Sequence, residues 1–169
     1  VGSGTAFQIV IARRIGEQDS GAAFRTFRTG LLVHLSLGMI LLATVSLLNR
    51  GILVGFLSLP DVAAVFEPFL GIRRFGLIPF SLLLACNALF IGMAKTWPIL
   101  LASGSTALIN VVLDMAFVGG YWGFESQGAI GAAKASLIAE TCGMVFAMVL
   151  VWRILPESIR ERTLLKKEA

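Results

Sequence analysis

The sequence is poor in charged residues, and this lack excludes an ordinary soluble domain. Of its 169 residues only 14% are charged and 57% are hydrophobic, whereas globular chains carry about 25% charged residues to solvate their surfaces. The mean hydropathy is +0.87. Whole stretches of helical length lack any charge, so lipid must surround them.

The sequence also lacks the residue clusters that build most active sites. Cys86 and Cys142 fall in separate apolar segments without a CxxC spacing, so we expect both to pack against neighbouring helices rather than bind a metal. P-loop, nucleophile-elbow and HExxH motifs are absent. These absences argue against an enzyme and against ATP-driven transport by this chain. We expect no cofactor, and an ion gradient as the energy source.

The net charge of +4 does not indicate a nucleic-acid partner. Lysine and arginine gather between the apolar runs instead of forming one basic face, which is typical of a membrane protein whose basic loops set its orientation. We therefore expect a lipid bilayer, and no nucleic acid, around this chain.

Five apolar segments predict an all-α, polytopic transmembrane helix bundle, at residues 1–15, 30–48, 75–93, 98–119 and 128–152. The first segment is too short for a hydrocarbon core of about 30 Å. Because the sequence starts at Val1 without a signal-peptide pattern, we expect this segment to be the inner end of a helix whose start is missing. Residues 49–74 contain Pro60 and Pro68 and predict a non-cytoplasmic loop with a short helix or an interfacial segment.

The distribution of basic residues predicts the orientation in the membrane. Under this assignment one side holds ten basic residues and the other only three. The ten are Arg13, Arg14, Arg25, Arg28, Lys95, Arg153, Arg160, Arg162, Lys166 and Lys167. The positive-inside rule therefore places residues 13–28, 94–97 and the basic linker 153–169 in the cytoplasm.

Three ionisable residues lie inside the predicted spans, where each costs at least about 2.5 kcal/mol at a helix centre and so needs a reason. Asp114 follows Asn110 by one helical turn, and Ser103 and Thr106 extend the same polar stripe. Such a stripe must line a cavity or a polar helix contact. A carboxyl group there can exchange protons or cations with the outside, although a purely structural hydrogen bond is the alternative.

The other two ionisable residues, Glu140 and Lys134, lie in the last span. Glu140 shares a face with Ser136 and predicts either a second polar patch or a structural hydrogen bond to a neighbouring helix. Lys134 is on a different face, so it either snorkels outward or meets a carboxylate of another helix. His34 lies near the cytoplasmic end of its span, where we expect it to cap the helix or touch headgroups. Small residues at 128–135 should let a neighbouring helix approach closely.

Several segments are similar to one transporter family. Residues 2–19, GSGTAFQIVIARRIGEQD, resemble the end of the second helix and the following cytoplasmic loop of multidrug-and-toxin-extrusion transporters. Residues 92–120, GMAKTWPILLASGSTALINVVLDMAFVGG, and residues 128–136, GAIGAAKAS, resemble helices four to six of that family's N-terminal lobe. The N-x-x-x-D pair together with GxxGAA carries the resemblance best.

The resemblance implies about five helices of a six-helix lobe, within a transporter of twelve helices in two lobes. It places Asn110, Asp114 and Ser136 in a cation or proton site, with Ser103, Thr106, Lys134 and Glu140 as possible cavity-lining residues. Lys134 and Glu140 depart from the family pattern, which has a small or apolar residue and a polar amide there. The second lobe of the same polypeptide and the first helix would be missing.

The function that the resemblance implies is export of cationic or amphipathic drugs in exchange for H⁺ or Na⁺, by alternating access in a bacterial inner membrane. One alternative is a flippase for lipid-linked precursors, which would need cationic residues in its cavity, and Lys134 is the one candidate. Another is a membrane scaffold without transport activity. An intramembrane enzyme would need a clustered catalytic set, which Asp114, Lys134 and Glu140 do not form in the sequence.

Overall fold

A computed structural model describes residues 2–48 and 60–154, and these residues form an all-α bundle. Its α-helices are α1 (Gly2–Gly16), α2 (Ser20–Leu48), α4 (Pro60–Arg73), α5 (Leu77–Gly92), α6 (Trp97–Phe117) and α7 (Gly128–Ile154). Two short 3-10 helices are η1 (Arg74–Gly76) and η2 (Tyr121–Gly123). Four stretches are long and apolar enough to cross a membrane: Ser20–Leu48, Val62–Gly92, Trp97–Phe117 and Gly128–Ile154. The predicted polytopic helix bundle is confirmed.

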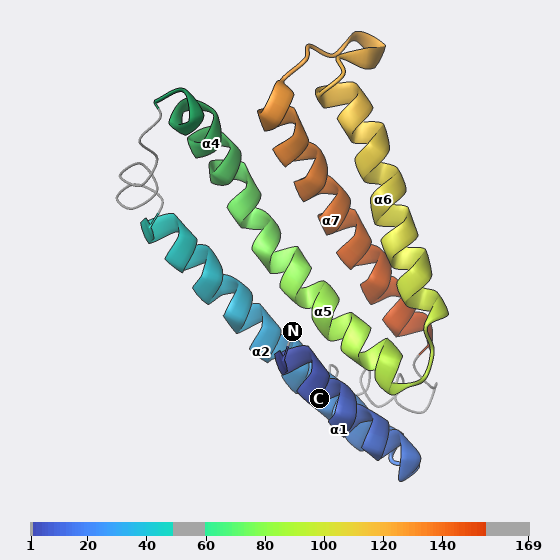
Figure 1. Ribbon diagram of the computed structural model, residues 1–169. Coiled ribbons are helices and arrows are strands. Elements are labelled where there is room, and N and C mark those ends of the chain that lie inside the picture. Colours follow the sequence, from blue (N-terminus) through green and yellow to red (C-terminus); the bar gives the residue numbers. More distant parts are fainter. Residues whose placement is uncertain (1, 49–59, 155–169) are drawn as a thin grey trace, which may run out of the picture.

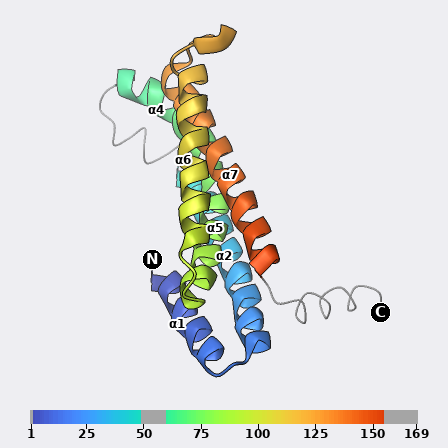
Figure 2. The ribbon, with the colours of Figure 1, turned by 90° about the vertical axis from the view of Figure 1, so that its right-hand side faces the viewer.

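The long helices stand in a row, with α2, α4–α5, α7 and α6 following one another across the molecule (Figure 1). The helix α1 packs against α2 and α5 at one end, and Figure 2 shows the row from its side. The turns α1–α2 and α5–α6 and the end of α7 lie at that same end, which we call the basic end. The chain thus returns to the basic end after every second crossing, which agrees with the order of crossings predicted from the sequence.

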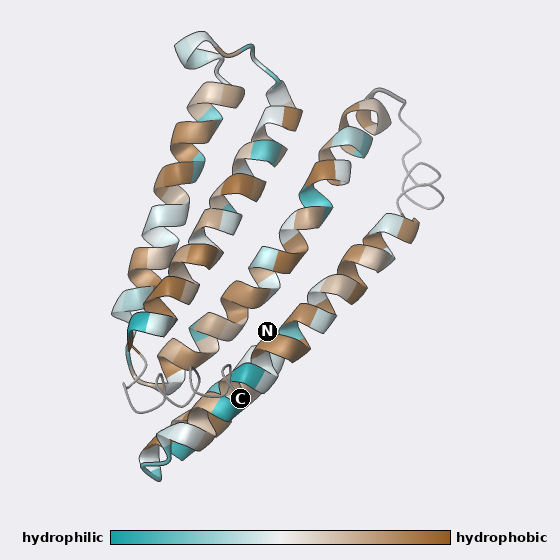
Figure 3. Ribbon diagram, turned by 180° about the vertical axis from the view of Figure 1, so that it is seen from behind, coloured by the Kyte–Doolittle hydropathy of each residue, from teal (hydrophilic) through white to brown (hydrophobic). Residues whose placement is uncertain are grey.

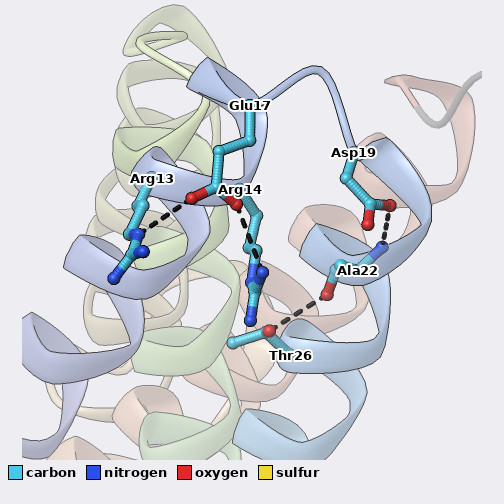
Figure 4. A network of polar contacts seen from close by, with 6 residues as sticks. All are labelled: Arg13, Arg14, Glu17, Asp19, Ala22 and Thr26. Carbon is cyan, nitrogen blue, oxygen red and sulfur yellow. Dashed lines mark hydrogen bonds and ion pairs between the residues drawn. The ribbon is translucent and has the colours of Figure 1, made fainter.

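The turn between α1 and α2 explains why α2 begins at Ser20, before the expected start of the span at residue 30. The Asp19 carboxylate accepts a hydrogen bond of 2.7 Å from the Ala22 backbone N–H, which satisfies one of the free donors of the first helical turn. Glu17 accepts hydrogen bonds from Arg13 and Arg14 at 2.9 and 3.2 Å (Figure 4). The charged stretch that we placed on the cytoplasmic side is thus largely helical itself.

The short helix predicted within residues 49–74 is present in their described part, but it is not a separate loop helix or interfacial segment. Residues 60–73 form α4, which continues through η1 into α5. Proline was the misleading signal. Pro60 occupies the first helical position, where its missing N–H costs nothing, and a membrane helix tolerates Pro68 and Pro79 because neighbouring groups satisfy the freed carbonyls. Residues 49–59 of the predicted loop lie outside the described residues.

Three other helix ends differ from their predicted positions by one or two residues, whereas α2 ends at Leu48 and α7 begins at Gly128 as predicted. The helix α5 ends at Gly92, α6 ends at Phe117, and α7 continues to Ile154. The linker predicted at residues 153–169 lies outside the described residues from position 155 onward. Apolar residues cover the middle of the long helices, and hydrophilic residues gather at the α1–α2 turn (Figure 3).

The buried core lies toward the basic end of the bundle. It joins the last turns of α1, α5 and α7 to the first turns of α2 and α6, through Ile11, Phe27, Leu89, Phe90, Ala102 and Leu150. Cys86 belongs to this core, as predicted, but Cys142 is exposed on α7. The core holds the helices together at one end, and the polar contacts described below lie farther along them.

Candidate functional site

The close pairing of α6 and α7 positions the predicted site residues. Gly131 of α7 faces the Phe117 backbone: a β-carbon at Gly131 would lie 2.5 Å from the Phe117 carbonyl oxygen. Gly143 lies against Thr106 of α6 in the same way. Small residues of α7 therefore allow α6 to pack closely against it, as the sequence predicted.

Asn110, Asp114 and Ser136 meet across this helix pair. The Asn110 amide lies between the other two side chains, and its Nδ2 is 3.4 Å from Ser136 Oγ in one orientation. With the amide turned over, Nδ2 donates to Asp114 Oδ2 at 3.3 Å and the amide oxygen accepts from the Ser136 backbone N–H at 3.3 Å. In the second orientation both the amide nitrogen and the amide oxygen have hydrogen-bond partners, and we prefer it for that reason.

Asp114 keeps one carboxylate oxygen free of hydrogen bonds among the described residues. Its Oδ1 is buried and has no partner there, while the side chain as a whole is half-buried. An unpartnered carboxylate oxygen in an apolar bundle is costly. A proton or a cation bound to this oxygen would remove the cost, so the group has the chemistry of an ion-binding site.

The rest of the polar stripe borders a cleft between α5, α6 and α7. We call it the asparagine-lined cleft: it measures about 300 Å³ and is lined by Phe80, Leu83, Ser103, Thr106, Ala107, Asn110, Ser136, Ala139 and Glu140. Thr106 Oγ1 donates to the Ala102 carbonyl at 2.9 Å, and Ser103 is exposed. The stripe thus faces a cavity and a helix contact, which are the two surroundings that its polarity requires.

Glu140 forms an ion pair with Arg73, at the end of α4. Arg73 Nη1 donates to Oε2 at 2.7 Å and Nη2 donates to Oε1 at 2.5 Å, a bidentate arrangement that suits a guanidinium and a carboxylate. The side chains of Arg73 and Glu140 are 35% and 19% exposed. The predicted structural contact of Glu140 with a neighbouring helix is therefore present, and its partner is charged.

A second cleft lies on the other side of this ion pair, between α2, the α4–α5 junction and α7. We call it the arginine-lined cleft: it measures about 330 Å³ and is lined by Val45, Leu70, Arg73, Arg74, Gly76, Leu77, Phe80 and Glu140. Arg74 is engaged locally, since its Nε donates to the Gly71 carbonyl at 3.1 Å and its guanidinium lies 5.1 Å from the centre of the Phe75 ring.

Lys134 does not meet a carboxylate in the described part of the chain. It is exposed, and its Nζ donates to Gln127 Oε1 at 2.7 Å, in the loop that precedes α7. Lys134 is thus directed outward, and snorkelling to the membrane surface stays a prediction. Lys134 lines neither of the two clefts.

His34 was predicted to cap its helix or touch headgroups, and this prediction was wrong. The side chain is 2% exposed, with its Nδ1 2.8 Å from the Gly30 carbonyl oxygen and its ring 5.7 Å from the Phe7 ring. The histidine is buried because α1 packs over this face of α2. The position of His34 along α2 does not reveal that α1 folds back over it, so the sequence alone did not predict this burial.

Sequence reasoning did not identify Arg73 as the partner of Glu140, because it assigned residues 49–74 to a loop with a short helix or to an interfacial segment. One signal could have found it. A carboxylate such as Glu140 inside the membrane requires a cationic partner, and Lys134 cannot be that partner because it lies on another face of the same helix. Arg73 and Arg74 are the basic residues nearest the middle of the α4–α5 stretch. A helix through Pro68 would have placed one of them inside the bundle.

Comparison with known proteins agrees with this arrangement of a multi-pass α-helical membrane protein. Residues 1–116 match the model of the MatE family, and the chain belongs to that family. Its curated relatives include proteins named "Probable multidrug resistance protein NorM". The one from Agrobacterium fabrum (strain C58) is 28% identical over 89% of this chain and 32% of the relative. The one from Rhizobium meliloti (strain 1021) is 30% identical over 90% of this chain and 33% of the relative.

A third relative of the same name, from Xylella fastidiosa (strain 9a5c), is 27% identical over 81% of this chain and 28% of its own length. The chain thus spans about a third of the length of the curated relatives it matches. No solved structure matches the chain.

Proposed function

We propose that this chain forms part of a secondary antiporter that exports cationic or amphipathic drugs in exchange for H⁺ or Na⁺. The protein would work by alternating access in a bacterial plasma membrane, with residues 13–28 and 94–97 on the cytoplasmic side. Membership of the MatE family and the names of the curated relatives support drug export. A transporter, rather than an enzyme, also fits the absence of catalytic motifs from the sequence.

The observation that carries the coupling proposal is the unpartnered oxygen of Asp114. Asn110 holds the other oxygen of the carboxylate and Ser136 brings a hydroxyl group close by, and carboxylate and hydroxyl oxygens are hard ligands suited to a small cation. Asp114 Oδ1 is buried without a partner among the described residues, so binding of a proton or Na⁺ would stabilise this carboxylate by giving the oxygen a partner. Binding and release at this carboxylate would then couple the gradient to drug export.

Glu140 is less suited to coupling, because both of its oxygens already accept hydrogen bonds from Arg73. A carboxylate in a bidentate ion pair has no need of a second cation. The flippase alternative would require free cationic side chains in the cavity. Arg73 is paired with Glu140. Arg74 is engaged with Gly71 and Phe75, and Lys134 is exposed and bonded to Gln127, so drug export fits these residues better.

The test is efflux by the complete gene product reconstituted in vesicles, with an imposed proton or sodium gradient and a fluorescent organic cation as the probe. We expect Asp114→Asn to abolish gradient-driven efflux while the amount of protein in the membrane stays normal. Glu125→Gln is the matched control, since it removes one carboxylate from the exposed loop before α7 and should leave efflux unchanged. Full gradient-driven activity of Asp114→Asn would contradict the coupling proposal.

A further inference from the structure

We propose that the Arg73–Glu140 ion pair sets the charge preference of the two clefts that it joins. In this inference Arg73 is a specificity-determining residue: by neutralising Glu140, it limits how strongly the clefts favour a cation over an anion. The inference rests on the proposed function for the kind of ligand that enters. Its own content is that one residue of the α4–α5 junction controls which charge is accepted.

The first step is the position of the pair. Glu140 and Phe80 line both clefts, so one carboxylate and one aromatic ring form the wall that the clefts share. Arg73 reaches this wall from the α4–α5 junction, near the middle of the long helical stretch 60–92, and Glu140 lies near the middle of α7. A ligand in either cleft therefore meets the same charged group.

The second step is the chemistry of the walls. Ligand sites are cavities of about 300 to 1,000 Å³, mostly apolar, with a few polar groups that fix orientation and specificity. The two clefts, at about 300 and 330 Å³, are at the lower end of that range. Apart from the ion pair and Arg74, the arginine-lined cleft is walled by apolar side chains and Gly76. The shared wall and Arg74 therefore carry the charges that a ligand encounters there.

The third step is the balance of charge within the pair. With both partners present, the wall carries a carboxylate and a guanidinium whose charges cancel. Removing one partner leaves the other charge unpaired in an environment of low dielectric, where it strongly attracts a ligand of opposite charge. Loss of Arg73 should then favour cations, and loss of Glu140 should favour anions.

The local backbone positions Arg73 for its contact with Glu140. The α-helix gives way to the 3-10 helix η1 directly after Arg73, and Gly76 leaves room for the guanidinium and carboxylate groups. A β-carbon at Gly76 would lie 2.7 Å from Glu140 Oε2 and closer still to Arg73 Nη1. The neighbouring Arg74 is engaged with Gly71 and Phe75 instead.

The experiment measures binding of two ions of equal shape and opposite charge, tetraphenylphosphonium and tetraphenylborate, to the complete gene product in detergent. Their affinity ratio cancels changes that affect both ligands alike. We expect Arg73→Gln to shift the ratio toward the cation by about tenfold, which corresponds to one unpaired charge in a partly buried site. We expect Glu140→Gln to shift it toward the anion by a similar factor.

Two further variants separate specificity from folding. The exchange variant Arg73→Glu with Glu140→Arg rebuilds the pair in reverse, and we expect the wild-type ratio, even if a single variant folds poorly. Lys134→Gln is the matched control: it removes one positive charge from α7 outside both clefts and should leave the ratio unchanged. Both readouts are independent of gradient-driven efflux, so this inference and the proposed function can fail separately.

Three results would overturn the inference. One is a shift of both ligands in the same direction in the single variants, as a purely structural pair would give. Another is a changed ratio in a folded exchange variant. The third is failure of the wild-type protein to bind either ion, since the clefts would then not be ligand sites.

Discussion

Gly143 of α7 lies directly against the side chain of Thr106 of α6, so close that a β-carbon at Gly143 would overlap the threonine hydroxyl. Thr106 cannot easily move aside, because its Oγ1 donates to the Ala102 carbonyl at 2.9 Å within α6. We predict that Gly143→Ala pushes the two helices apart and lowers the free energy of unfolding by about 1–3 kcal/mol, the usual cost of overpacking a tight contact. Denaturant unfolding of the complete protein in detergent micelles measures the change.

The matched control for this contact is Gly104→Ala, which adds a methyl group to the partner helix α6. Nothing lies within 4 Å of a β-carbon at Gly104, so this variant should be neutral, or stabilising through the better helix propensity of alanine. Equal effects of Gly143→Ala and Gly104→Ala would show that helix propensity, and not the contact with Thr106, decides the result.

Gly76 is the position at which the smallest change should break the Arg73–Glu140 pair. An added β-carbon would occupy the space of the guanidinium and carboxylate groups, and the flexible arginine side chain would give way first. We predict that Gly76→Ala exposes the Glu140 carboxylate and shifts the affinity ratio of tetraphenylphosphonium to tetraphenylborate toward the cation, as Arg73→Gln does. Binding titrations with the two ions measure that ratio.

Gly71→Ala provides the comparison for Gly76, since it changes a glycine of α4 whose β-carbon would meet nothing within 4 Å. It should leave the affinity ratio at the wild-type value. A wild-type ratio in Gly76→Ala would mean that the ion pair tolerates displacement and does not depend on the space at Gly76.

The sequence predicted the helical architecture well because helix formation in a membrane depends on long apolar runs, and these are visible in one dimension. It did not predict that α4 continues into α5 as one membrane-crossing stretch, because Pro68 and the adjacent charges are also typical of a loop. In a bundle, proline is tolerated and a charge finds a partner on another helix. Whether such a partner exists depends on residues far away in the chain, as Arg73 and Glu140 show.

The candidate site was predictable in part for the same reason. Asn110 and Asp114 are one turn apart, so helical periodicity alone places them together, and the structure brings Ser136 to them as the family resemblance implied. The pairing of Glu140 with Arg73 and the burial of His34 required the packing of separate helices. Their roles in binding remain predictions that the experiments above address.

The α1–α2 turn should respond to acid. Hydrogen bonding from Arg13 holds the pKa of Glu17 below its ordinary value, with further lowering by the charges of Arg13 and Arg14. A carboxyl group with a lowered pKa stabilises the fold above its unfolded-state pKa, and the stabilisation is lost as the pH falls through the folded-state pKa. We therefore predict that backbone hydrogen exchange in residues 16–19 becomes faster, beyond its intrinsic pH dependence, below about pH 4.

Glu17→Gln should remove this acid response of the turn, because the amide does not titrate. The Asp19 cap remains in that variant, so the start of α2 should stay protected near neutral pH. An acid response of the same size in wild type and Glu17→Gln would show that Glu17 does not cause it.

The orientation of the Asn110 amide determines which neighbour it stabilises, and two double-mutant cycles distinguish the possibilities. In the preferred orientation Asn110 bonds the Asp114 carboxylate and the Ser136 backbone N–H, whereas in the other it bonds Ser136 Oγ. We predict a coupling energy between Asn110→Ala and Asp114→Ala of about 0.6 kcal/mol, the average for hydrogen bonds between polar side chains in membrane bundles. The cycle with Ser136→Ala should give a coupling near zero, because the backbone N–H persists in alanine. Unfolding free energies of the single and double variants provide both values, and the reverse pattern would assign the amide to the Ser136 hydroxyl.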